Sequence, residues 1–224
     1  DNLLSIYTNL IKILNKLSEG MATSVLIFVL TLMFSLPLGL FVALMRMSRH
    51  KVLQNLMRIY ISVMRGTPLM LQLLVVYFGP YYIFGIKLSP DYRFWAVIIA
   101  FVINYAAYFA EIYRGGIASV PSGQYEAAKV LGYSSSQTFL KIIFPQMIKR
   151  IIPPITNEVI TLIKDTSLAF AVAVTEMFTV AKALASAEKT MTAYVFAGVF
   201  YYVFNLIVAF VMENIEKRLN YYRL

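Results

Sequence analysis

The sequence predicts an all-α membrane protein in which five helices cross the lipid bilayer. Hydrophobic residues make up 60% of the 224 residues and charged residues 14%, whereas soluble domains contain about 25% charged residues. A chain of this composition has too few polar side chains to cover itself in water. Lysine and arginine exceed aspartate and glutamate by 20 to 11, which in a membrane protein is typical of basic cytoplasmic loops. We therefore expect a bilayer around the chain and no nucleic-acid partner.

Several chemistries are excluded by the residue types. The chain has no cysteine and a single histidine, His50, in a basic loop. It also lacks the phosphate-binding pattern Gly-x4-Gly-Lys-Ser/Thr. We therefore expect no catalytic residue, no metal site and no cofactor in this chain.

Apolar segments that can cross a hydrocarbon core of ~30 Å, which takes about 20 helical residues, recur along the chain. The expected spans cover residues 23–45, 52–84, 95–113, 153–180 and 191–212. Glycine, proline and polar groups are expected to break the second span at 65–68 and the fourth at 164–167. Pro153 and Pro154 are expected to open the fourth span, and residues 182–189 to form an outer loop.

Basic residues follow the first, third and fifth expected spans, which all end on one side of the membrane. This pattern places the N-terminus outside and the C-terminus in the cytoplasm, with residues 213–224 as a tail. No feature divides the chain, so residues 1–224 are expected to form a single transmembrane domain.

Residues 1–18 show a helical spacing of apolar side chains. These are Leu3, Leu4, Tyr7, Leu10, Ile11, Leu14 and Leu17. The pattern predicts an amphipathic helix at the membrane surface. An extension of the first span explains it equally well.

A short polar segment, residues 124–131, separates the third and fourth spans and is too short to cross the membrane. Pro121 and Gly123 precede it, and Gly132 can supply the left-handed residue that ends a helix. In an arbitrary membrane protein such a segment is a plain connecting loop.

The spacing around this segment resembles a loop of bacterial ABC-importer permeases, with the pattern Glu-Ala-Ala, three residues, Gly, nine residues, Ile-x-Leu-Pro. The matching residues are Glu126, Ala127, Ala128, Gly132 and Ile142–Pro145, with Phe144 in place of the leucine. Further segments similar to amino-acid permeases of this family are Met64–Pro68, Ala110–Ile117 and Lys164–Leu168. The chain thus resembles the permease subunit of a polar or basic amino-acid ABC importer with the type I importer fold.

The resemblance implies that residues 121–145 form a cytoplasmic coupling loop whose helix docks on a separate ATPase subunit. Glu126 would pair with a partner cation or with its own helix start. Ala127 and Ala128 would allow close approach, and Gly132 would allow a sharp exit, so that the helix transmits ATPase closure as a lever.

The resemblance also implies partners. ATP and Mg would be bound by the ATPase subunits. A second permease subunit, identical or different, would complete the path, because five spans rarely enclose one alone. An extracytoplasmic substrate-binding protein would deliver substrate to this multi-pass protein of the bacterial cytoplasmic (inner) membrane.

Polar residues of the fourth span predict the substrate, because each charge inside a bilayer is costly and is a functional hypothesis. The span contains Asn157, Glu158, Thr161 and Asp165. Glu158 and Asp165 are seven residues apart, so two helical turns bring them to nearly the same face. Two carboxylates suit a cation, and we favour arginine, lysine or histidine, with glutamine or another polar amino acid as the alternative.

The carboxylate of an amino acid needs hydrogen-bond donors. A helix that restarts after Asp165 would present the amides near Thr166 and Ser167. Met64, Arg65 and Thr67 at the other break are expected to face the same site.

Structural roles compete with these assignments. Asp165 could cap a helix that begins at Thr166, which does not exclude ligand contact. Glu158 could pair with Lys164, Arg65 or Lys149 instead of substrate.

Two other acidic residues have simpler expectations. Glu111 and Arg114, three residues apart, are expected to form a structural pair. Glu176 is expected near the outer mouth.

Two other classes of function are less consistent with the sequence. An intramembrane hydrolase could use Glu158 and Asp165 as acids, and would cleave a transmembrane peptide without an ATPase. A channel or half of a secondary transporter would work without ATP, but neither needs the coupling loop. The sequence therefore favours ATP-driven uptake by alternating access through this subunit.

Overall fold

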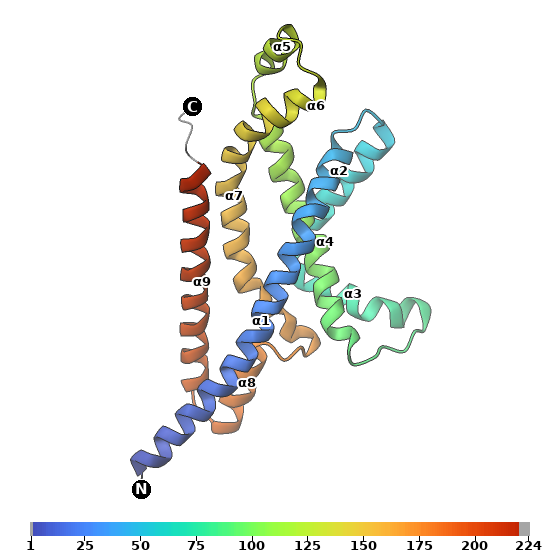
Figure 1. Ribbon diagram of the computed structural model, residues 1–224. Coiled ribbons are helices and arrows are strands. Elements are labelled where there is room, and N and C mark those ends of the chain that lie inside the picture. Colours follow the sequence, from blue (N-terminus) through green and yellow to red (C-terminus); the bar gives the residue numbers. More distant parts are fainter. Residues whose placement is uncertain (1, 220–224) are drawn as a thin grey trace. The chain divides into compact units, whose positions relative to one another are not determined.

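The computed structural model describes residues 2–219, apart from the side chains of residues 2, 3, 5 and 6, and its regular elements are all helices (Figure 1). They are α1 (Asn2–Arg46), α2 (Lys51–Gly66), α3 (Leu69–Phe84), α4 (Tyr92–Ala118), α5 (Ser122–Val130), α6 (Ser135–Thr138), η1 (Phe139–Ile143), α7 (Phe144–Asp165), η2 (Thr166–Val172), α8 (Met177–Glu188) and α9 (Thr192–Leu219). The expected all-α class is confirmed for this range. The expected side-chain pattern at Leu3 and the end of the expected tail, 220–224, lie outside it.

Three of the described helices are long and apolar enough to span a membrane. They are Tyr7–Arg46, Tyr92–Ala118 and Thr192–Leu219, and an 18-residue stretch within each has a mean hydropathy of 2.6, 1.7 and 2.2, respectively. Two further pairs meet the criterion if each is one broken or re-entrant span. These are Lys51–Gly66 with Leu69–Phe84, and Ser135–Val172 with Met177–Glu188. The predicted interruption at 65–68 is confirmed, since α2 ends at Gly66 and α3 begins at Leu69.

Two expected boundaries are wrong. Pro153 and Pro154 do not open a helix but lie inside α7, which already begins at Phe144. Proline removes one backbone donor and kinks a helix, and membrane proteins tolerate this where other groups satisfy the backbone. Residues 182–188 are not a loop, because α8 continues to Glu188 and buries Leu184 and Ala185 despite its exposed Lys182.

The described chain divides into two compact units, and each is described by itself. The first comprises Asp1–Met33, Thr67–Val102 and Ile160–Val208. Its core joins α1, α8 and α9 through Ile13, Leu17, Met177, Ala181, Leu184, Ala185, Ala193 and Ala197. Because α1 is continuous and its early residues Ile13 and Leu17 are buried in this core, residues 2–18 match the alternative of an extended first helix.

The second unit comprises Phe34–Gly66, Ile103–Val159 and Ala209–Leu224. A cluster of buried residues joins α1, α2 and α4 through Val42, Ala43, Ile61, Ala107 and Ala110. Hydrogen bonds from the hydroxyls of Tyr60 to Ile103 O and of Tyr113 to Leu36 O link the same helices. Small alanines at these positions let the helices approach closely, as is common in membrane bundles.

Gly116 is where α4 packs against α7, and we expect Gly116→Ala to destabilise the protein. A Cβ atom there would overlap Ile151 Cγ2 and lie 3.0 Å from Met147 Cγ. Such overpacking costs about 1–3 kcal/mol. The adjacent Gly115→Ala is the matched control, since its Cβ would meet nothing within 4 Å and alanine favours a helix by about 1 kcal/mol. Thermal unfolding in detergent should give a lower Tm for Gly116→Ala than for Gly115→Ala, and equal values would contradict this packing.

Candidate functional site

The segment between α4 and α7 folds as a short helix with a defined exit. α5 follows Pro121, whose extended backbone (φ −57°, ψ 141°) precedes the first turn. Gly132 has φ +78°, the left-handed conformation that glycine adopts without strain. The amide of Tyr133 then donates to Ala128 O at 3.0 Å. The predicted role of Gly132 in ending this helix is thus confirmed.

A second helical turn, which the sequence analysis missed, closes the loop. The side chain of Ser134 accepts from the Gln137 amide, and the Gln137 side chain accepts from the Ser134 amide. This reciprocal capping box starts α6, and the spacing Ser-x-x-Gln could have revealed it. Within the unit, Arg150 of α7 donates to Ser119 O after α4. Figure 1 shows α5 and α6 beyond the ends of α4 and α7.

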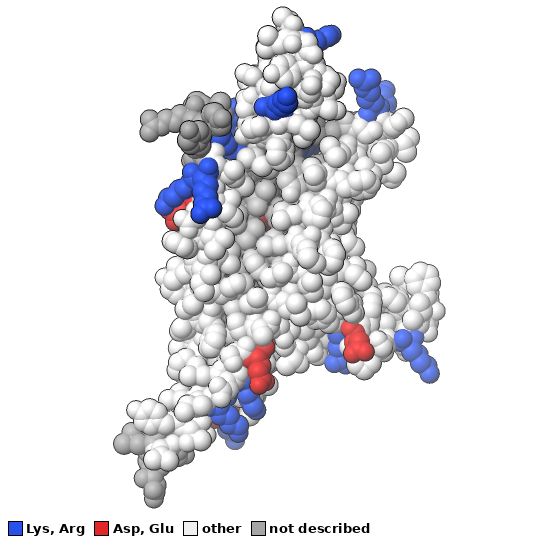
Figure 2. Space-filling view, viewed as in Figure 1, with Lys and Arg blue, Asp and Glu red and all other residues white. Residues whose placement is uncertain are grey.

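The accessible surface of this loop is partly apolar. Val130 is 87% exposed and Leu131 73% exposed, although burial of such side chains is favourable. Glu126 and Ala127 are exposed. Ala128 is only 1% exposed, so its small side chain is buried within the free chain, and its expected role of permitting close approach to a partner stays a prediction. Figure 2 shows only scattered lysines and arginines over the visible face of α5 and α6.

At the break between α2 and α3, side chains satisfy the backbone. The Asn104 carboxamide donates to Met64 O at 3.0 Å, and the Arg65 guanidinium lies 5.3 Å from the centre of the Tyr108 ring. After the break, Gln72 Nε2 donates to Thr67 O at 3.1 Å and to Thr67 Oγ1 at 2.7 Å. Asn104 was missed by sequence reasoning, although a carboxamide in an apolar run was its signal.

The polar residues predicted in the fourth span lie on α7. The helix continues without interruption to Asp165, so Glu158 and Asp165 keep the two-turn spacing. Asn157 and Glu158 belong to the same unit as Met64 and Arg65. Thr161, Asp165, Thr166 and Ser167 belong to the unit that contains Thr67.

The helix that starts at Thr166 is a 3₁₀ helix that continues directly from α7, and not the separate α-helix after a break that was expected. The chain passes from α7 into the 3₁₀ helix η2, and Asp165 has helical dihedral angles and makes no side-chain cap bond to η2. The hydroxyls of Thr166 and Ser167 donate to Ile163 O and Lys164 O, each at 2.7 Å. The amides near these residues therefore do not form the open helix N-terminus that was expected to attract an anion.

The helix start occurs instead at Met177. Ala173 turns the chain with φ +58°, and Glu176 caps α8 by accepting from the amides of Phe178 at 2.7 Å and Thr179 at 2.8 Å. The Met177 amide donates to Ser24 Oγ of α1 at 3.1 Å. Glu176 is 0% exposed and serves as a buried helix cap, and its expected place near the outer mouth stays a prediction.

The predicted structural pair of Glu111 and Arg114 is confirmed. Arg114 Nε donates to both carboxylate oxygens of Glu111, at 3.1 and 3.0 Å, and its Nη2 forms a further ion pair. The two residues are three apart on α4, where side chains are neighbours.

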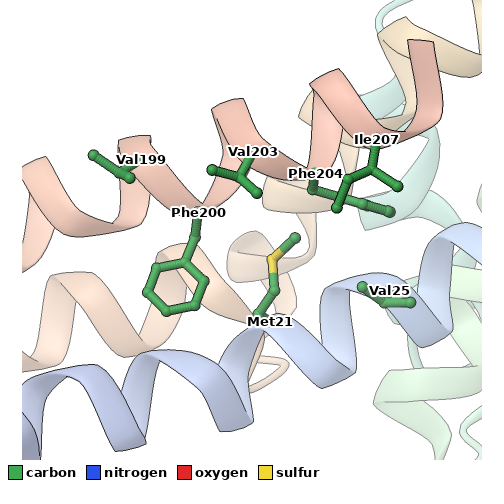
Figure 3. Close-up of a pocket in the computed structure, with 7 residues that line it drawn as sticks. All are labelled: Met21, Val25, Val199, Phe200, Val203, Phe204 and Ile207. Atoms are coloured by element: carbon green, nitrogen blue, oxygen red, sulfur yellow. The ribbon is translucent and has the colours of Figure 1, made fainter. Parts of the chain in front are cut away.

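Two grooves of the first unit are described. One, with a volume of about 390 Å³, is formed by α1 and α9 and has apolar walls (Figure 3). Its lining consists of Met21, Val25, Val199, Phe200, Val203, Phe204 and Ile207. It offers no polar group for the charges of an amino acid. The other, of about 520 Å³, includes Lys16, Glu19, Thr175 and Thr179. Neither groove contains a residue predicted to bind substrate.

Three helices of membrane-spanning length and two bent helix pairs are the features of an α-helical membrane protein. The sequence matches the family described as "binding-protein-dependent transport system inner membrane component" over residues 35–221. The chain therefore belongs to this family, and the predicted resemblance is confirmed.

Named relatives and a solved structure agree with this family. The chain is 36% identical to the L-cystine transport system permease protein TcyB of Bacillus subtilis (strain 168), over 92% of this chain and 87% of that protein. It is 35% identical to the arginine transport system permease protein ArtQ of the same organism, over 90% and 91%. A crystal structure of an amino acid ABC transporter with histidines has a TM-score of 0.85 and 32% identity, over 94% of this chain and 97% of that one.

Proposed function

We propose that this chain is the transmembrane subunit of an ATP-driven importer that carries basic amino acids across the bacterial cytoplasmic membrane. The family supports the importer class, and relatives named for arginine and cystine support an amino-acid substrate. The observation that carries the basic specificity is the unbroken helix α7, on which Glu158 and Asp165 are seven residues apart. Two carboxylates on nearly one face suit a cationic side chain.

The other groups of the proposed substrate site come from both broken regions. Asn157 and Thr161 of α7 would add hydrogen bonds beside the carboxylates. Arg65 is the cation of the proposed set and would bind the substrate's carboxylate, with Met64 and Thr67 beside it. Thr166 would help to shape the site but would not offer its hydroxyl to the substrate. That hydroxyl is buried and already donates to Ile163 O. Ser167 remains a proposed contact.

We further propose that α5 is the coupling helix and docks on the ATPase, which would hold ATP and Mg. This is supported by the exposed Val130 and Leu131, whose apolar surface would be buried by a partner. Glu126 and Ala127 are exposed on the same helix. The chain itself lacks the phosphate-binding pattern, and the family consists of permease subunits, with hydrolysis on a separate subunit.

In the proposed complex the chain is one transmembrane domain with five spans, the N-terminus outside and the C-terminus in the cytoplasm. The two broken helix pairs would each count as one span, which gives five together with the three continuous helices. A second permease subunit would complete the path, and an extracytoplasmic binding protein would deliver the substrate; the family's description as binding-protein-dependent supports the second partner.

Uptake into proteoliposomes tests this function. The vesicles would hold this chain, its ATPase and the binding protein, and labelled arginine, glutamine and glutamate would be compared with and without ATP. ATP-dependent uptake with a preference for arginine is expected. A preference for glutamine would keep the importer and remove the basic specificity, and uptake that ignores ATP would contradict the importer itself.

A further inference from the structure

Glu176 is a buried carboxylate surrounded by donors. Its Oε1 accepts from the Thr179 amide at 2.8 Å and from Thr179 Oγ1 at 2.9 Å, while its Oε2 accepts from the Phe178 amide at 2.7 Å and from Tyr201 Oη at 3.2 Å. Ser24 Oγ lies 3.5 Å from Oε2. Among residues 2–219, no lysine or arginine forms an ion pair with it. All these partners can donate, so both oxygens of the carboxyl group are satisfied.

The partners of Glu176 come from three helices. Ser24 belongs to α1, Thr179 to α8 and Tyr201 to α9. α1 allows this close meeting at Gly20, because a Cβ atom there would lie 3.0 Å from Met177 Cα. Capping alone does not require a glutamate, since serine, threonine, aspartate and asparagine are the preferred capping residues. The longer side chain is needed to reach Tyr201.

Tyr201 connects this carboxylate to the start of η2. Its hydroxyl also lies near the side chain of Thr166, the first residue of η2, whose own hydroxyl donates to Ile163 O at 2.7 Å. Glu176 follows the end of η2, Val172, by four residues, and its partner Tyr201 lies near the start of η2 at Thr166. A 3₁₀ helix of seven residues is a weak element by itself, so its position depends on such contacts.

We propose that Glu176 is a positioning residue for transport, which acts through Tyr201 to hold η2 and the adjacent end of α7 in the conformation that binds substrate. This rests on the proposed function, because Thr161, Asp165 and Ser167 lie on these two segments. Glu176 does not contact the substrate. It fixes the segment that carries the contacts.

Three variants separate this role from capping. Glu176→Asp keeps a good capping residue but shortens the side chain that reaches Tyr201. Tyr201→Phe removes only the hydroxyl and leaves the cap intact. Tyr202→Phe is the matched control, since Tyr202 is exposed on the same helix. The double variant of Glu176 and Tyr201 tests whether the two residues act through one link.

Hydrogen exchange of the assembled transporter, with uptake measured in parallel, tests the proposal. Glu176→Asp and Tyr201→Phe should each raise the exchange rate in residues 166–172 by up to about tenfold, the size expected for the loss of one hydrogen bond. They should slow arginine uptake by a similar factor without changing exchange in α5 or the yield of complex. The double variant should be no worse than either single variant.

Several outcomes would overturn the positioning role. Wild-type exchange in residues 166–172 for Tyr201→Phe would do so even if Glu176→Asp failed to fold. Additive effects in the double variant would show two independent contacts and remove the link. An effect of Tyr202→Phe equal to that of Tyr201→Phe would also overturn it. Failure of the wild-type complex to import any amino acid would instead contradict the proposed function.

Discussion

Replacing Val130 and Leu131 together with aspartate is expected to abolish ATP-driven uptake while the permease stays folded. Both side chains are exposed in the free chain, at 87% and 73%, so the substitutions remove no internal packing. In the proposed complex they are buried against the ATPase, where each would contribute about 1.5–3 kcal/mol. Burying an unpaired charge there costs still more. We expect ATPase binding to weaken at least about 100-fold, measured by co-purification and by uptake.

The matched control keeps the surface apolar. Val130→Leu with Leu131→Met retains hydrophobic side chains of similar size and should co-purify with the ATPase and transport at nearly the wild-type rate. Thermal unfolding should give the same Tm for both double variants, because neither site is buried in the free chain. Normal uptake by the aspartate variant would remove α5 from the docking surface.

Glu158→Gln is expected to reduce the preference for arginine over glutamine about tenfold or more. The substitution keeps the shape of the side chain and removes its charge, and a hydrogen bond to a charged partner is worth about 1.5–3 kcal/mol. Uptake of arginine should therefore fall much more than uptake of glutamine. The two labelled amino acids would be measured in competition in the same proteoliposomes, with the amount of assembled complex determined in parallel.

Glu213→Gln provides the control for loss of a carboxylate. Glu213 forms an exposed pair with Lys217 at 2.7 Å, and exposed pairs contribute about 0–1 kcal/mol. Neither the selectivity nor the yield of complex should change in this variant. If Glu158→Gln keeps the wild-type ratio of arginine to glutamine, then Glu158 has a structural role and does not select the substrate.

Local rules predicted the features that depend on a few neighbouring residues. Gly66 and Pro68 predicted the break between α2 and α3, and Gly132 predicted the left-handed backbone conformation that follows α5. The pair of Glu111 and Arg114 followed from helical spacing alone. In each case the feature depends on residues within one or two helical turns of each other, so it can be predicted from the local sequence.

The features that sequence reasoning missed depend on distant residues. Glu176 becomes a buried cap only because Ser24 and Tyr201, 152 and 25 residues away, supply donors to it. Lys182 and Lys189 suggested a loop, but residues of α8 between them are buried against α1 and α9. Thr166 was expected to start a helix because the 3₁₀ continuation has no clear sequence signal.

The prolines within α7 give this helix a mechanical property. Pro153 and Pro154 cannot donate to the carbonyls of residues 149 and 150, so two consecutive rungs of the ladder are absent between the loop end of α7 and Glu158. A helix bends most easily where such hydrogen bonds are missing, so α7 is expected to bend at its two prolines. A displacement imposed at Phe144 would then arrive at Glu158 mainly as a change of tilt.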